Sequence, residues 1–73
     1  EYFSVDRVKG DVDVEKDDLH VVICISGSAE LRSGGEVVEI GPGRSVLIPA
    51  STTNYEIRPS ADAEIYVISP GEL

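Results

Sequence analysis

The chain has one imidazole and one thiol, at His20 and Cys24, and these are side chains suited to proton transfer or metal binding. Both fall in the apolar run Leu19-His-Val-Val-Ile-Cys-Ile25. On a strand they face the same side, but four residues at about 3.3 Å each hold them roughly 13 Å apart. One tetrahedral ion cannot span that distance, so the pair does not predict a metal site. Cys24 has no basic neighbour in sequence, so we expect a protonated, inert thiol.

A lone histidine leaves two interpretations open. With an ordinary pKa near neutrality, His20 could transfer protons. Alternatively, it is a structural histidine that hydrogen-bonds to a neighbouring side chain. We favour the structural role, because a histidine without a partnering carboxylate or metal seldom does chemistry.

The composition restricts the partners. Fourteen acidic residues against six Lys and Arg give a formal charge of −8. A surface of this sign repels phosphate backbones and anionic lipid, so we expect neither nucleic acid nor a membrane as partner. No apolar run approaches the about 18 residues of a membrane span. A single Cys excludes an internal disulfide and favours a reducing, cytoplasmic location.

Strand patterns account for the whole chain. β-Branched residues dominate every apolar run, and Gly or Pro interrupts the chain every ten residues or so. The clearest hairpin is Leu31 to Val37, since Gly34-Gly35 suits a tight primed turn. About eight short strands with tight turns predict an all-β fold, a small antiparallel barrel or sandwich whose closure removes exposed edges. The expected strands are 2–8, 11–14, 19–26, 29–33, 36–40, 45–49, 55–59 and 64–69.

The strand at 19–26 is apolar on both faces. Val21, Ile23 and Ile25 point to one side, opposite to the side that His20 and Cys24 share. An antiparallel strand with one wet face would alternate, so something must cover its outer side. We expect the N-terminal strand 2–8 to do so, with a neighbouring domain or a second copy of the chain as alternatives.

The stretch from Gly43 to Arg58 resembles the second sequence motif of cupin barrels, Gly-x5-Pro-x-Gly-x2-His-x3-Asn. Gly43, five spacers and Pro49 match it. Ser51 replaces the second Gly, Asn54 stands at the position of the metal-binding His, and Arg58 stands at the final Asn. An amide is a poor ligand for zinc or iron. The resemblance therefore implies a cupin jelly roll that keeps the frame of a metal site without its ligand.

The first cupin motif, Gly-x5-His-x-His-x3–4-Glu-x6-Gly, gives the same result. Six spacers before Gly27 is His20, which thus takes the position of the Glu ligand, and residues 13–17 hold no His. We assign no metal-binding residue. Because the two motifs face each other in cupins, the resemblance implies His20, Asn54 and Ser51 as candidate ligand-binding residues at the barrel mouth, with Asn54 hydrogen-bonded to His20. For Ser51 the alternative is an ordinary polar turn after Pro49.

Three segments narrow the resemblance further. They are Tyr2-Phe-Ser-Val-Asp-Arg-Val, Leu19-His-Val-Val-Ile-Cys-Ile-Ser-Gly-Ser-Ala-Glu-Leu and Gly43-Arg-Ser-Val-Leu-Ile-Pro-Ala. In this order they resemble the C-terminal cupin domain of type I mannose-6-phosphate isomerases, over residues 2 to about 67. Such enzymes interconvert mannose 6-phosphate and fructose 6-phosphate with zinc assistance. Their zinc and catalytic residues lie in the preceding N-terminal domain, and none matches a position here, so we assign no catalytic residue.

We therefore expect residues 1–73 to form one cupin-like domain, the C-terminal fragment of a longer chain. Its expected partner is the preceding catalytic cupin domain, which it would stabilise and whose cleft it would help to wall, with a homodimer as the alternative. No cofactor is expected in this chain, and zinc is expected in the parent's N-terminal domain. The competing function is a free-standing, metal-free module that binds a small ligand such as a sugar. A metal-dependent cupin enzyme with unusual ligands is disfavoured by the missing histidines.

Overall fold

The computed structural model describes residues 3–16 and 18–70 of the chain. Within these residues the chain forms strands joined by turns and contains no helix, so no helix long and apolar enough to cross a membrane is found there either. The strands are β1 (Phe3–Val8), β2 (Val12–Glu15), β3 (His20–Ser26), β4 (Ala29–Ser33), β5 (Glu36–Ile40), β6 (Arg44–Ile48), β7 (Asn54–Pro59) and β8 (Glu64–Pro70). Each predicted strand is present with its ends within one residue, and Tyr2 lies outside the described residues.

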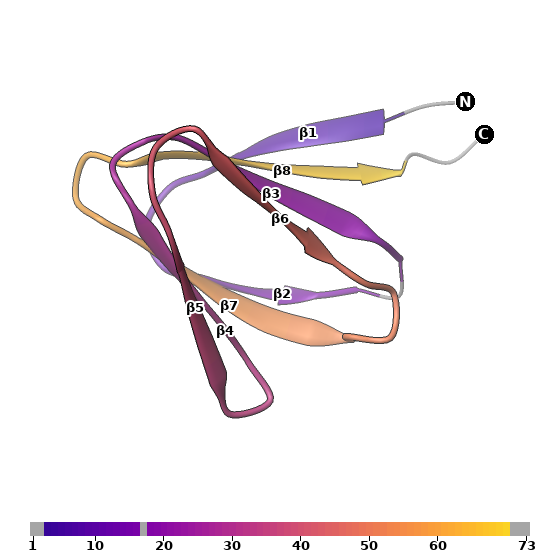
Figure 1. Cartoon of the computed structure of the whole chain (residues 1–73). Coiled ribbons are helices and arrows are strands. Elements are labelled where there is room, and N and C mark those ends of the chain that lie inside the picture. Colours follow the sequence, from indigo (N-terminus) through magenta and orange to yellow (C-terminus); the bar gives the residue numbers. More distant parts are fainter. Residues whose placement is uncertain (1–2, 17, 71–73) are drawn as a thin grey trace.

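The strands form two four-stranded antiparallel sheets packed face to face (Figure 1). The first sheet has the order β1-β8-β3-β6 and the second sheet has the order β2-β7-β4-β5. Every pairing is antiparallel, and the interleaved order is that of a double-sheet jelly roll. The predicted all-β, cupin-like jelly roll is confirmed.

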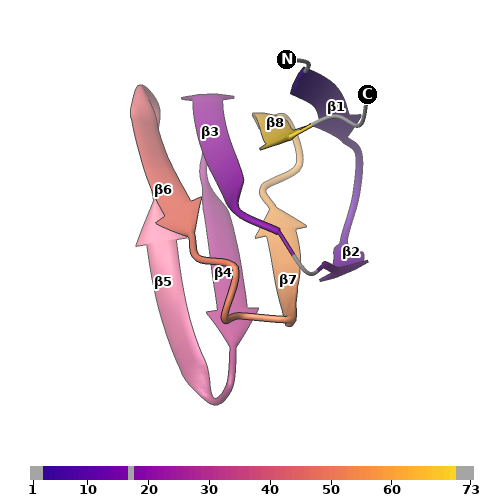
Figure 2. The same cartoon turned by 90° about the vertical axis from the view of Figure 1, so that its right-hand side faces the viewer.

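The two sheets diverge toward one end of the molecule. In Figure 1 they lie closest on the left and are most widely separated on the right, where the β2–β3 and β6–β7 connections run. Figure 2 looks into this open end and shows β3 and β6 facing β4 and β5. The open end is the barrel mouth, and His20 begins β3 beside it.

The core lies between the sheets and follows the two-residue period of each strand. On the inner face of the first sheet, Val22 lies between Val46 and Val67. On the inner face of the second sheet, Ile57 lies between Val12 and Leu31. Val22 and Ile57 are both 0% exposed, because side chains two apart share a face and these faces meet.

The tight turn at Gly34-Gly35 connects β4 and β5 as predicted. Both glycines have positive φ, at 57° and 86°. A two-residue primed turn requires this conformation at both central positions, and its twist matches that of the flanking strands. The Gly-Gly pair thus fixes the β4–β5 register, in which Ser33 pairs with Glu36.

The prediction that the N-terminal strand covers the outer side of β3 is wrong. β1 lies in the same sheet as β3, two places along, and pairs with β8 from Phe3↔Pro70 to Val8↔Ile65. The edge of β8 offers a row of backbone N–H and C=O groups that a strand in the plane satisfies and a strand laid over the face does not. The outer face of β3 is therefore not covered by β1.

Candidate functional site

A histidine–tyrosine pair occupies the barrel mouth. His20 faces Ile48 of β6 and shares the inner face of β3 with the fully buried Val22 and Cys24. Its Nδ1 lies 3.0 Å from the hydroxyl of Tyr55 on the opposite sheet. The two rings meet edge to face, with centroids 6.0 Å apart and an interplanar angle of 85°. Tyr55 is 2% exposed, so this hydrogen bond joins the two sheets at the edge of the core.

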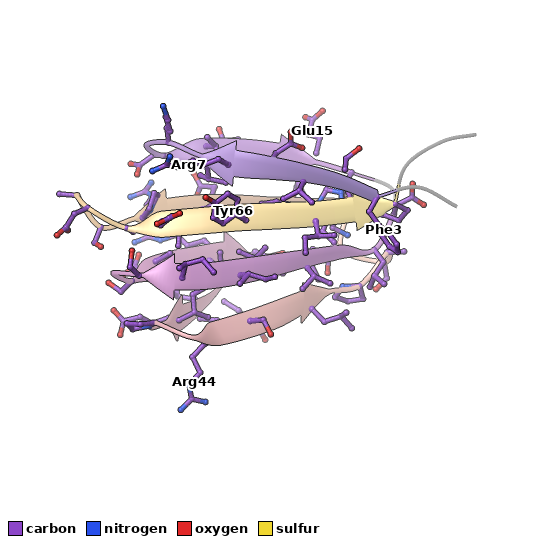
Figure 3. All side chains as sticks on the ribbon, turned by 90° about the horizontal axis from the view of Figure 1, so that it is seen from above. Phe3, Arg7, Glu15, Arg44 and Tyr66 are labelled. Atoms are coloured by element: carbon purple, nitrogen blue, oxygen red, sulfur yellow. The ribbon has the colours of Figure 1, made fainter. Side chains whose placement is uncertain are left out.

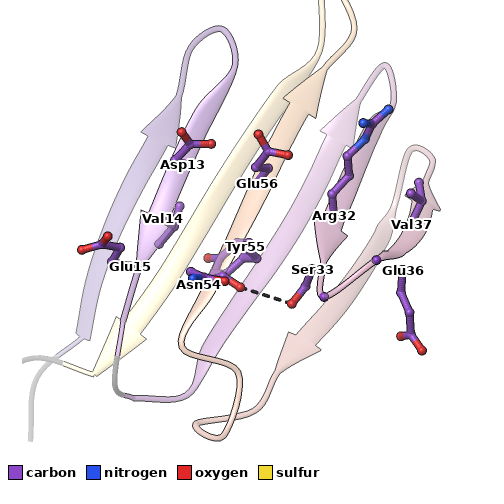
Figure 4. Close-up of a pocket in the computed structure, with 12 residues that line it drawn as sticks. Asp13, Val14, Glu15, Arg32, Ser33, Glu36, Val37, Asn54, Tyr55 and Glu56 are labelled. Atoms are coloured by element: carbon purple, nitrogen blue, oxygen red, sulfur yellow. Dashed lines mark hydrogen bonds between the residues drawn. The ribbon is translucent and has the colours of Figure 1, made fainter.

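Asn54 does not take the place that the sequence predicted for it. Asn54 is exposed, and in the strand register of β2 and β7 it lies opposite Glu15. Its backbone carbonyl accepts a hydrogen bond of 3.2 Å from Ser33 Oγ (Figure 4). The expected partnership of Asn54 with His20 is made by Tyr55 instead. Because successive side chains of a strand alternate, the position beside the buried Ile57 that points inward is 55 and not 54.

Ser51 is exposed in the turn that follows Pro49. A hydrogen bond of 3.0 Å from the Thr52 N–H to the Pro49 carbonyl closes this turn. The polar-turn interpretation of Ser51 accounts for its position. Of the three candidate ligand-binding residues, only His20 lies on an inner face, and Asn54 and Ser51 are both exposed.

Lys16 is a residue of the mouth that the sequence analysis missed. Its Nζ donates to the Pro49 carbonyl at 2.5 Å and to the Asp18 carbonyl at 2.7 Å, and its backbone N–H donates to the Thr53 carbonyl at 2.8 Å. Lys16 therefore links the β2–β3 connection to the β6–β7 connection. No sequence signal marks the contact between Lys16 and Pro49, which lie 33 positions apart. Tyr55, in contrast, could have been found from the sequence, because it lies two residues before the apolar Ile57 and therefore shares its face of the strand.

The electrostatics of the mouth favour neutral groups. Burial lowers the pKa of His20 below its ordinary value, and the nearby Lys16 charge lowers it further, against a smaller opposing effect of Asp18 and Asp6. Burial raises the pKa of Tyr55 to about 12. Imidazole and phenol are therefore both uncharged at neutral pH, which suits a hydrogen bond between the sheets. Burial likewise raises the pKa of the Cys24 thiol, in agreement with the expected inert cysteine.

The residues at the mouth do not fit the metal that cupin barrels commonly hold. His20 is a single imidazole whose Nδ1 is engaged by Tyr55. Within residues 3–16 and 18–70, no group of three or more His, Cys, Asp or Glu is placed to hold an ion. Structural and catalytic zinc sites need at least three such protein ligands.

The hollow between the sheets is also small. It has a volume of about 200 Å³ and is lined mostly by aliphatic side chains, with Ser33, Glu36, Thr52 and Tyr55 as polar members. Pockets that enclose metabolite-sized ligands usually measure about 300–1,000 Å³.

A larger hollow of about 590 Å³ lies on the second sheet (Figure 4). Its single basic lining residue, Arg32, is paired with Glu30 at 3.0 Å, and its acidic lining residues repel a phosphorylated ligand. These lining acids are Asp13, Glu15, Glu36 and Glu56.

Removing the Tyr55 hydroxyl tests the inter-sheet hydrogen bond. We expect Tyr55→Phe to lower the free energy of unfolding by about 1 kcal/mol, since it removes one partner of a part-buried pair. Asn54→Ala, at the neighbouring exposed position, should change it by about 0.5 kcal/mol or less. Urea unfolding of both variants measures the difference. Equal effects would mean that the His20–Tyr55 contact contributes nothing to stability.

The pH dependence of stability should report on His20, the one histidine of the chain. Its folded-state pKa is lowered, so below the ordinary value of about 6.5 the unfolded chain binds more protons than the folded chain. Stability should therefore be fully present above about pH 6.5 and fall as the pH drops through the folded-state pKa. Urea midpoints between about pH 5.5 and 7.5 measure this slope. His20→Gln should abolish it, and an unchanged slope in that variant would contradict the assignment.

The fold and the inner face define the class of protein, a cupin-type jelly roll. The family model of the mannose-6-phosphate isomerase cupin domain matches residues 1–70. Since this match spans nearly the whole chain, the chain belongs to the family of mannose-6-phosphate isomerase cupin domains.

Two solved structures have the same fold. A cupin-2 domain containing protein from Shewanella frigidimarina NCIMB 400 superposes with a TM-score of 0.76 at 21% identity, covering 94% of this chain and 69% of that chain. The mannose 6-phosphate isomerase from Bacillus subtilis superposes with a TM-score of 0.74 at 22% identity, covering 97% of this chain and 23% of that chain. At these identities the likeness shows the fold alone. No curated protein matches the chain.

Proposed function

We propose that this chain is the non-catalytic, C-terminal cupin domain of a zinc-dependent mannose-6-phosphate isomerase. In this proposal a preceding domain holds the zinc and interconverts mannose 6-phosphate and fructose 6-phosphate in the cytoplasm, as a step of carbohydrate metabolism. The domain described here stabilises that catalytic domain and forms part of the wall of its cleft.

The observation that carries the proposal is that this family member lacks a set of metal-binding residues on its inner face. The chain matches the isomerase cupin family over residues 1–70, yet its mouth holds one imidazole hydrogen-bonded to a phenol. A zinc-assisted isomerisation needs ligands that the described residues do not assemble. The chemistry of such an enzyme is therefore assigned to another domain. The small volume between the sheets weighs against the competing function, a ligand-binding module.

The polypeptide that contains this chain allows a direct test. We expect that polypeptide to bind zinc and to convert mannose 6-phosphate, and we expect the 73-residue chain alone to do neither. In the full polypeptide, His20→Gln and Tyr55→Phe should leave kcat within about twofold of the parent, since neither side chain takes part in the transition state. Stoichiometric zinc in the isolated chain would contradict the proposal. So would a large loss of kcat in a folded His20→Gln polypeptide.

A further inference from the structure

The outer face of the first sheet is apolar across all four strands. In one row, Val5 of β1 pairs with Ile68 of β8, Ile68 with Val21 of β3, and Val21 with Leu47 of β6. All four of these side chains point away from the core, because their neighbours in sequence, such as Val67 and Val22, are buried between the sheets. We call the outer apolar face the set Phe3, Val5, Val21, Ile23, Leu47, Tyr66 and Ile68.

Three residues of this face are strongly exposed within the described part of the chain, and the other four are half-buried beside them. Phe3 is 68% exposed, and Val5 and Leu47 are each 60% exposed. Figure 3 looks down on the face, with Phe3, Arg7 and Tyr66 labelled along β1 and β8. β1, which was expected to cover the face, is instead one of its four strands. A contiguous apolar surface of this kind marks an interaction site in a folded protein.

The second sheet shows how a solvated face looks in the same molecule. Its outer row runs from Asp13 to Glu56 and Arg32, ending at Val37. Salt bridges join Arg32 to Glu30 and Arg58 to Glu56 on this face. The second sheet therefore alternates apolar and charged residues, as an antiparallel sheet facing water does. The first sheet has no such alternation, so its outer face is built for contact with another surface.

The size of the face indicates what kind of partner covers it. Four strands about 4.8 Å apart, each about six residues long at about 3.4 Å per residue, make a flat area of roughly 400 Å². Two such faces in contact bury about 800 Å². That value lies within the about 600–1,500 Å² of contacts between domains of one chain. It falls short of the about 1,200–2,000 Å² that hold independent proteins together, a second copy included.

We propose that the outer apolar face is the docking surface for a neighbouring domain of the same polypeptide, an inference that rests on the proposed function. A covalent link supplies a high effective concentration, which allows a face of this size to stay occupied. Phe3 belongs both to the face and to the beginning of β1, so a domain that precedes β1 is tethered beside the face. The surface that it presents is apolar and poor in charge, because Arg7 and Glu64 are the charged residues at the outward-pointing positions of the described strands of this sheet.

Cysteine labelling of the full polypeptide tests the docking surface. N-ethylmaleimide is the reagent, and mass spectrometry identifies the labelled peptide. Leu47→Cys places a thiol on the outer apolar face, and Val37→Cys places one on the outer face of the second sheet. The parent residues are 60% and 56% exposed, so the two sites are matched in the domain itself. We expect Leu47→Cys to react about tenfold or more slowly than Val37→Cys. Val5→Cys, on the same face, should be protected equally and guards against a local effect at Leu47.

The labelling rates decide whether the outer apolar face is covered and by what. Equal labelling rates at Leu47→Cys and Val37→Cys overturn the inference. Protection that disappears when the polypeptide is diluted also overturns it, because the occupant is then a second copy. Isomerase activity of the parent polypeptide is measured alongside. Activity with equal labelling rejects the docking surface alone, whereas protection without activity supports the docking surface and rejects the proposed function.

Discussion

Ile57→Ala is expected to destabilise the folded chain by about 2–5 kcal/mol, the range for removing an aliphatic side chain from a packed core. Ile57 is 0% exposed and lies at the centre of the second sheet, between Val12 of β2 and Leu31 of β4. The substitution removes three buried carbons and leaves a cavity that both sheets border. Strands on either side hold the backbone at fixed spacing, so the cavity cannot close by a simple shift.

The effect should be large relative to the total stability. For 73 residues that total is roughly 4–11 kcal/mol, so the variant is expected to be partly unfolded at room temperature. Val37→Ala is the matched control, because Val37 is 56% exposed and its loss of strand propensity costs at most about 1 kcal/mol. The chain has no Trp, so urea unfolding followed by far-UV circular dichroism measures both variants. Similar midpoints for the two variants would show that Ile57 is not part of a close-packed core.

The strands were predictable because the local signals agree with one another. Apolar residues two apart set each strand, and turn residues separate the strands. Gly34-Gly35, for example, adopts the positive φ values that its turn requires. A strand that pairs on both sides, such as β3, is fixed by its own apolar residues whatever its neighbours are. These properties belong to short segments, so they can be inferred without knowing the fold.

The site was predicted less well, because a motif fixes spacing but not the face of a strand. Asn54 was placed by counting from Pro49 across a turn, and the strand that follows this turn directs Tyr55 inward and Asn54 outward. A slip of one residue exchanges the two faces. Lys16 contacts Pro49 only because two connections meet at the mouth, and the sequence carries no local signal of that meeting.

The cover of β3 was mispredicted for a related reason. The sequence shows that both faces of the strand at 19–26 are apolar. The hydrophobic effect is non-directional, so this pattern does not specify which element covers an apolar face. Whether β1 lies over that strand or in its plane depends on which backbone groups need partners, and the free edge of β8 decides the matter. The apolar pattern thus predicted that the outer side of this strand is covered, and the occupant expected for it, β1, is wrong. This is why the outer face of the first sheet carries the inference about a neighbouring domain.

The second large effect is expected for Gly27→Ala, which should lower the free energy of unfolding by about 2–5 kcal/mol. Gly27 has a φ of +73°, where a side chain costs about 1–2 kcal/mol. A Cβ at this position would also lie 2.6 Å from Ala63 Cα and 2.8 Å from Ser60 Oγ. The neighbouring turns are held together by hydrogen bonds between Ser28 and Ser60, at 2.8 and 3.1 Å, so they cannot separate freely. Overpacking of this kind adds about 1–3 kcal/mol.

Gly10→Ala separates the two contributions. Gly10 has nearly the same φ, +72°, but no atom lies within 4 Å of the position that its Cβ would take. Its substitution should therefore cost only the backbone part, about 1–2 kcal/mol. The difference between the two variants in urea unfolding measures the contact between the β3–β4 turn and the β7–β8 turn. If Gly27→Ala costs no more than Gly10→Ala, the two turns are not in close contact. The glycine that ends the first cupin motif would then be required for its backbone conformation alone.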